Sequence, residues 1–183
     1  MRALVLALIT LLLCGCATMH YSETKPEELK GKLTVEWIEP DQFIFRPDND
    51  NPLTFTRYNK DKIVPGLMYT DGGSIPRPFW ALRSYSPWGY APAFIVHDRL
   101  FHMKHCQLPG SENFTTEEAA WVMSEVMKTL MEKEGIDKLA LYTMFEAVRS
   151  PIAVNLWNEG KCEQPHVRLV NVKPKMQYVI EFP

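Results

Sequence analysis

A histidine and an aspartate, His97 and Asp98, stand side by side near the middle of the chain, directly after the apolar run Phe94–Val96. Imidazole titrates near working pH and suits a general base, and a neighbouring carboxylate can orient it or bind a metal ion. Burying such a pair is costly unless its polar atoms find partners. The pair therefore indicates a catalytic centre, a metal site or a buried hydrogen-bonded connection, and the residues leave these alternatives open.

Residues 71–77, Asp-Gly-Gly-Ser-Ile-Pro-Arg, contain the other candidate site residues. Glycines permit close backbone approach, and calcium prefers carbonyl and carboxylate oxygens as ligands. The predicted metal ligands are therefore Asp98, Gly72 and Gly73, with calcium as the possible ion, whereas zinc would need more nitrogen or sulfur donors. The predicted binding residues are Asp71, Ser74 and Arg77, although a tight turn explains the glycine pair equally well.

The N-terminus resembles a bacterial lipoprotein signal peptide, because the apolar residues 3–13 lead into Leu13-Cys14-Gly15-Cys16. The resemblance implies cleavage before Cys16, acylation of that cysteine and insertion of its acyl chains into a bilayer. Ala17 follows, where an aspartate would resemble an inner-membrane retention signal, so we expect the periplasmic face of the outer membrane. An ordinary secretory signal with incidental cysteines is the alternative.

The rest of the chain has the composition of one folded domain. The 183 residues are 46% hydrophobic and 23% charged, and we divide them into a signal peptide (1–15), a lipidated polar tether (16–32) and a domain (33–183). The net charge of -2, with no basic block, argues against a nucleic-acid binder. The expected partners are the lipid bilayer, through acylated Cys16, and a protein of the cell envelope.

Periodicity predicts an α+β fold in which a small antiparallel sheet packs beside three to four helices. Alternating apolar residues predict strands within 32–46, 53–58, 167–172 and 177–182, with 53–58 pairing with the strand that precedes it. Apolar residues at helical spacing predict helices over 89–105, 115–134 and 137–149. Ser150-Pro151 then either kinks the third helix or caps a fourth over 151–158. In an oxidising compartment we expect Cys106 and Cys162, which follow two of these helices, to form a disulfide, with two free thiols as the alternative.

Several of these segments together resemble a family of small phage and bacterial proteins, domain of unknown function 1353. The matching residues lie between Thr34 and Trp157, and comprise Tyr69–Arg77, Trp80, Gly89-Tyr90, Val96–Asp98, Leu100-Phe101, Met144-Phe145 and Ala147–Arg149. The family has an Ala-Asp pair where this chain has Ala119-Ala120, so that carboxylate is absent unless Glu117 or Glu118 replaces it. The resemblance implies a shared fold but no established reaction.

A looser similarity is to secreted phospholipase A2, in which a glycine-rich loop supplies carbonyl oxygens to calcium and a later helix carries a His-Asp pair. The dense cysteine framework of that enzyme is missing here. Two functions follow as hypotheses: an outer-membrane-anchored lipoprotein of phage or prophage type that acts as an envelope interaction module, or a metal-assisted hydrolase. In both, we expect His97 and Asp98 to face residues 69–76, with at least one of them hydrogen-bonded there.

Overall fold

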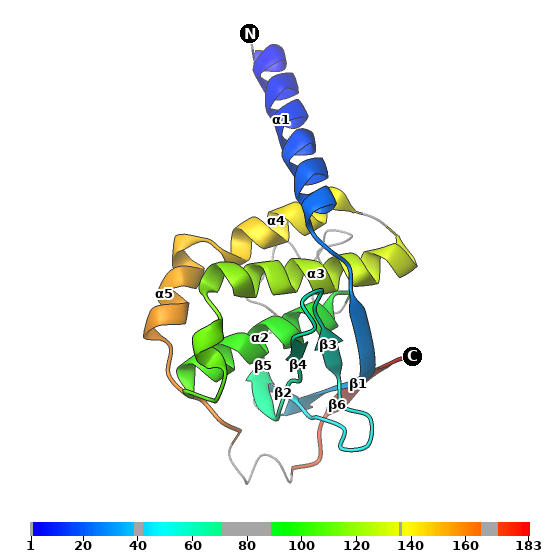
Figure 1. Cartoon of the computed structure of the whole chain (residues 1–183), viewed down its shortest axis with the longest axis vertical. Helices are drawn as coiled ribbons and strands as arrows, with labels where there is room; N and C mark the ends of the chain where they lie inside the picture. The colour runs from blue at the N-terminus through cyan, green and yellow to red at the C-terminus, as the bar shows by residue number, and fades with distance from the viewer. Residues whose placement is uncertain (1, 39–41, 71–88, 136, 166–171) are drawn as a thin grey trace.

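The computed structural model describes residues 2–38, 42–70, 89–135, 137–165 and 172–183 (Figure 1). Within these ranges the chain has the expected α+β fold, with five α-helices and a curled, six-stranded antiparallel sheet that forms half a barrel. The fifth helix is α1 (Arg2–Glu23), which precedes the sheet and covers the predicted signal peptide. No helix of the described residues is both long enough and apolar enough to cross a membrane.

The longest strand, β1 (Glu28–Ile38), lies at the centre of the sheet. Its Val35 lies opposite both Phe45 of β2 (Gln42–Phe45) and Tyr178 of β6 (Met176–Phe182). The chain end therefore completes the N-terminal sheet, as the alternation over 177–182 predicted. On its far side, β2 pairs with β5 (Met68–Thr70), which the predicted site residues 71–77 follow in the sequence.

The pairing predicted for residues 53–58 is wrong. The strand β3 (Thr54–Thr56) pairs with Glu28–Lys30 of β1 rather than with β2, and β4 (Lys62–Ile63) pairs with β3. Gly31 makes this possible because its φ of 93° bends β1 directly after the segment that pairs with β3. A Cβ at Gly31 would collide with the backbone carbonyl of Pro52, so only glycine fits this bend.

Four further α-helices follow the strands: α2 (Ala91–His105), α3 (Thr116–Glu134), α4 (Lys138–Val148) and α5 (Pro151–Glu159). Each begins close to its predicted residue, and side-chain caps fix the starts of α3, α4 and α5. Thr115 and Glu118 form a capping box, Asp137 accepts from Ala140 N–H, and Ser150 accepts from Ala153 N–H ahead of Pro151. All four predicted helices are confirmed.

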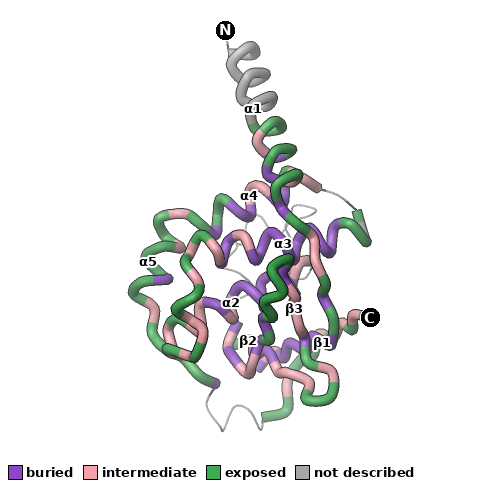
Figure 2. The backbone as a smooth tube through the Cα atoms, viewed as in Figure 1, coloured by how far each residue is buried: buried purple, intermediate pink, exposed green. Residues whose placement is uncertain are grey.

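The core lies between the sheet and α2 and α3 (Figure 2). Phe45 and Phe55 enter it from the sheet, and the run Phe94–Val96 enters it from α2. The methionines of α3 follow helical spacing and are buried in the same cluster, including Met123 and Met127. Because α2 packs against α3, β5 and α5, its polar residues after Val96 have possible partners on those elements.

Most of residues 16–32, where the composition predicted a polar tether, is part of the fold. The last turns of α1 pack against α4, and Ala17, His20 and Thr24 are buried. The ammonium group of Lys128 donates to the carbonyl oxygens of Tyr21 and Thr24, each at 2.7 Å. The strand β1 then begins at Glu28. Helical spacing of these buried residues outweighs the polar composition that suggested a tether.

The predicted disulfide is confirmed. Cys106 directly follows α2, and Cys162 lies three residues beyond the end of α5. Their Cα atoms are 4.5 Å apart, within the range that a disulfide requires. The bond closes a loop with a sequence separation of 56 residues and ties the C-terminal end of α2 to the segment that follows α5.

Candidate functional site

His97 lies on the side of α2 that packs against α3. Its side chain is 4% exposed, its Nδ1 lies 3.0 Å from the carbonyl oxygen of Ala119, and its ring contacts the ring of Phe101 with centroids 4.9 Å apart. A carbonyl oxygen only accepts hydrogen bonds, so Nδ1 carries the proton. In the neutral ring the lone pair is then on Nε2, the arrangement found in histidines that act as bases or bind metals.

Asp98 faces a different element. Thr70, the last residue of β5, donates from Oγ1 to Asp98 Oδ2 at 2.6 Å. The carboxylate of Asp98 therefore lies beside the residue that immediately precedes Asp71. This bond confirms the prediction that at least one member of the pair would be hydrogen-bonded within residues 69–76.

The two members of the pair diverge, because consecutive helical residues point about 100° apart. Asp98 reaches β5, as expected, while the ring of His97 reaches a carbonyl of α3 that the sequence did not suggest. The pair thus joins α2 to two different elements. The sequence indicated that polar partners were required, but a backbone carbonyl carries no side-chain signal that could have identified Ala119.

The other predicted site residues, Asp71, Gly72, Gly73, Ser74 and Arg77, lie outside the described residues, so their roles stay predictions. Among the residues that are described, no group of three His, Cys, Asp or Glu side chains could share a metal ion. The predicted ligand Asp98 has oxygen chemistry that fits calcium, and the remaining predicted ligands are the two glycine carbonyls.

The position of the family's Ala-Asp pair lies in the first turns of α3. Ala119 and Ala120 are both fully buried. Glu118 accepts from the backbone N–H of Thr115 in the capping box, and Glu117 pairs with Arg149 at 3.3 Å. Both glutamates already have partners, and the suggestion that either one replaces the missing carboxylate stays a prediction.

His20 is a second buried histidine, on a segment for which the polar composition predicts a tether. His20 lies on α1 with its Nε2 3.2 Å from Ser124 Oγ, and its ring packs 4.9 Å from Trp121 and 4.2 Å from Phe145, between ring centroids. Burial, reinforced by the charge of Arg149, lowers the pKa of His20 to about 4. The signal that could have revealed it is the spacing of Ala17, His20 and Thr24 along one helical face.

A buried ion pair also lay beyond sequence reasoning. Arg57, directly after β3, donates from Nε and Nη2 to the two carboxylate oxygens of Glu125 on α3, both at 2.8 Å. Both side chains are buried. The two residues are 68 positions apart, and nothing in the local sequence of either one specifies the other. The pair fastens the β3 end of the sheet to α3.

Comparison with known proteins identifies one relationship. Residues 50–148, more than half of the chain, match the family described as "Protein of unknown function (DUF1353)". No curated protein and no solved structure matches the chain. The matched range contains β3, β4, β5, α2, α3 and α4, and therefore includes both His97 and Asp98.

Proposed function

Because the chain belongs to the DUF1353 family, whose description names no function, we propose a function from its structure: a lipid-anchored envelope protein with a non-catalytic interaction domain. In this proposal acylated Cys16 holds the protein in the outer membrane, with the domain on the periplasmic side. The domain binds another protein of the envelope, and His97 and Asp98 serve its stability.

The proposal rests on the point along α1 at which side chains begin to pack against the domain. Leu13, Cys14 and Gly15 are exposed, Cys16 is half-buried and Ala17 is buried. Figure 1 shows that α1 extends away from the rest of the molecule and approaches it only near its C-terminal end. Cleavage before Cys16 would therefore leave every described buried residue in the mature chain. This match between the lipobox-like sequence and the packing boundary supports Cys16 as the first mature residue.

The disulfide supports a periplasmic location for the domain. Disulfides persist in oxidising surroundings such as the bacterial periplasm and are rare in reducing ones. The Cys106–Cys162 bond joins residues on either side of α3, α4 and α5, so it constrains much of the helical part of the domain. An anchor at Cys16 and a structural disulfide are compatible with one another only if the domain faces an oxidising space.

The contacts of the central pair support the non-catalytic reading. The buried ring of His97 is fixed to the backbone of α3, and Asp98 is bonded to the end of β5. Together they connect three elements around the core, which is a sufficient reason for a polar pair after Phe94–Val96.

A metal-assisted hydrolase is the second candidate, and one observation favours it. The bond from His97 Nδ1 to Ala119 makes Nε2 the basic nitrogen of the neutral ring, as a general base requires. Asp98 is bonded to Thr70, the residue directly before the predicted site residues 71–77. In that candidate His97 would activate water, and Asp98 with the carbonyls of Gly72 and Gly73 would bind calcium.

Acylation of Cys16 tests the proposal directly, and the neighbouring Cys14 provides the control substitution. We expect Cys16→Ser to leave unprocessed precursor and to abolish incorporation of a fatty-acid analogue when the full chain is expressed in a bacterium with an outer membrane. Cys14→Ser, which changes the neighbouring cysteine of the same motif, should be processed and labelled normally. Labelling that persists in Cys16→Ser, or recovery of the labelled protein with the inner membrane, would contradict the proposed anchor.

A further inference from the structure

Arg99 differs from the other arginines whose side chains are described. Arg46, Arg57 and Arg149 each form an ion pair with a glutamate. Arg99 is partly buried on α2, yet it pairs with no described carboxylate, and its buried Nε has no hydrogen-bond partner. Burial lowers the pKa of Arg99, and a guanidinium stays charged in proteins even so. A charge that is partly withdrawn from water without a counter-ion is costly for the folded chain.

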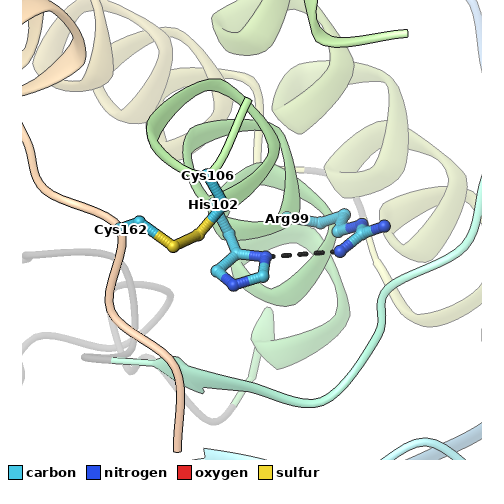
Figure 3. The surroundings of a disulfide bond; sticks show 4 residues. All are labelled: Arg99, His102, Cys106 and Cys162. Carbon is cyan, nitrogen blue, oxygen red and sulfur yellow. Dashed lines mark hydrogen bonds between the residues drawn. A yellow bond between two sulfur atoms is a disulfide. The ribbon is translucent and has the colours of Figure 1, made fainter. Parts of the chain in front are cut away.

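Among the described residues, the Arg99 guanidinium forms one hydrogen bond, to His102, one turn further along α2. Arg99 Nη1 lies 3.3 Å from His102 Nδ1 (Figure 3). Guanidinium N–H groups only donate, so His102 Nδ1 accepts and the neutral ring carries its proton on Nε2. Burial, with smaller effects of Arg99 and His105, lowers the pKa of His102 and so favours that neutral ring.

Two buried donors are therefore left without acceptors. The Nε–H of Arg99 and the Nε2–H of His102 have no hydrogen-bond partner among the described residues. The two side chains extend from the same side of α2 and point toward one another beside the Cys106–Cys162 disulfide, as Figure 3 shows. Native proteins satisfy nearly all such groups, so a nearby pair of orphaned donors indicates a missing acceptor.

Gly66 lies beside the guanidinium, where a Cβ would make an ordinary van der Waals contact of 3.4 Å with Arg99 Nη1. The disulfide at Cys106 holds the end of α2 in place, so the two donors keep their relative position before any ligand arrives.

We propose that Arg99 and His102 form a binding site for an oxyanion of the phosphate class. Such a group supplies the negative charge that Arg99 lacks and enough oxygen acceptors for donors from two residues. The ligand is either free phosphate or the phosphodiester of a lipid headgroup, since both present the same oxygens. The site is distinct from the His97–Asp98 pair, and it does not depend on the proposed membrane anchor.

Titration calorimetry on the full-length protein in detergent tests the site, with inorganic phosphate as the probe and ionic strength held constant with chloride. We expect saturable binding of one phosphate and a rise in Tm of several degrees at saturation. Arg99→Met and His102→Asn should each weaken binding at least tenfold. Lys104→Gln removes an exposed cation from the same helix and should change binding less than twofold.

Stability without phosphate separates a binding role from a structural one. Because Arg99 has no internal counter-ion, Arg99→Met should melt at the same temperature as the wild type or higher when no phosphate is present. A structural arginine would instead lower Tm on substitution. The ¹⁵N resonance of His102 Nε2 in the wild-type protein gives a readout that needs no variant, and phosphate should shift it.

Titration with two ligands shows whether the bound oxyanion is a lipid headgroup or free phosphate. Glycerophosphoglycerol, the water-soluble headgroup of phosphatidylglycerol, is titrated in parallel with inorganic phosphate. Binding of both, or of either one, supports the site, and the tighter of the two identifies a lipid headgroup or a free anion as the source. The proposal is overturned if neither shifts the His102 resonance, or if Lys104→Gln weakens binding as much as Arg99→Met.

Discussion

Substituting His97 can distinguish a structural role from a catalytic one, because the two roles predict different effects on stability. Its ring is buried, donates to a carbonyl of α3 and packs against Phe101. Removing the ring leaves the carbonyl of Ala119 without this donor and leaves a void beside Phe101. Each of these effects destabilises a core, whereas a residue kept only for catalysis tends to cost stability while it is present.

We therefore predict that His97→Ala lowers the free energy of unfolding by about 1–3 kcal/mol, the cost of leaving a buried polar partner unsatisfied. Urea unfolding of the disulfide-intact protein measures it, with exposed Lys104→Ala on the same helix as the control for helix propensity. An unchanged or increased stability would favour the hydrolase candidate, and calcium-dependent stabilisation lost in the same variant would strengthen that conclusion.

His20 makes stability depend on pH. Its pKa is lowered from 6.5 to about 4, so between these values the unfolded chain binds a proton that the folded chain does not. Stability contributed by neutral His20 is fully present above pH 6.5 and falls as the pH drops toward 4. We predict that His20→Phe, which keeps an aromatic ring among Trp121 and Phe145, shows a smaller loss of Tm between pH 7 and pH 4.5 than the wild type.

Thermal melts across that range check the His20 prediction, because other titrating groups contribute equally to both proteins and cancel in the difference. At pH 7 the variant should be somewhat less stable, since Ser124 loses its partner. Parallel pH profiles for the two proteins would show that His20 titrates normally in the folded chain.

At the scale of elements, the sequence predicted what local residues decide and missed what distant residues decide. The starts of α3, α4 and α5 follow from caps at Thr115, Asp137 and Ser150, each within one turn of the residues it bonds. The pairing of β3 with β1 joins segments more than 20 residues apart through a bend that alternation cannot reveal. The contact between Asp98 and Thr70 was within reach because both the donor segment and the need for a partner were visible in the sequence.

Gly31 provides the test of that bend. We predict that Gly31→Ala lowers the free energy of unfolding by about 2 kcal/mol or more, because an L-residue is strained at this φ and its Cβ would collide with the carbonyl of Pro52. The matched control is Gly66→Ala, which has ordinary space and no positive φ. Equal denaturation midpoints for the two variants would show that β1 is not held in this conformation.

At the scale of the whole molecule, the position of the anchor and the packing of α1 are linked. If Cys16 carries the acyl chains, the buried residues Ala17 and His20 follow at once, with no flexible spacer between bilayer and domain. The α1 and α4 end of the domain would then lie against the membrane, and rotation of the domain relative to the bilayer would be limited. The expectation of a tether would have implied the opposite, a domain that moves freely at a distance from the surface.

Two shortened chains distinguish these pictures without any lipid. A chain that starts at Ala17 keeps every described buried residue, and we predict that its Tm equals that of the full-length protein. A chain that starts at Lys25 loses Ala17, His20 and Thr24 from the core and removes both carbonyl acceptors of Lys128, so its Tm should fall by at least 5 °C. Circular dichroism melts at equal protein concentration provide the comparison. Equal melting temperatures for the two chains would mean that residues 17–24 behave as a tether after all, and the anchor would then leave the domain free to move.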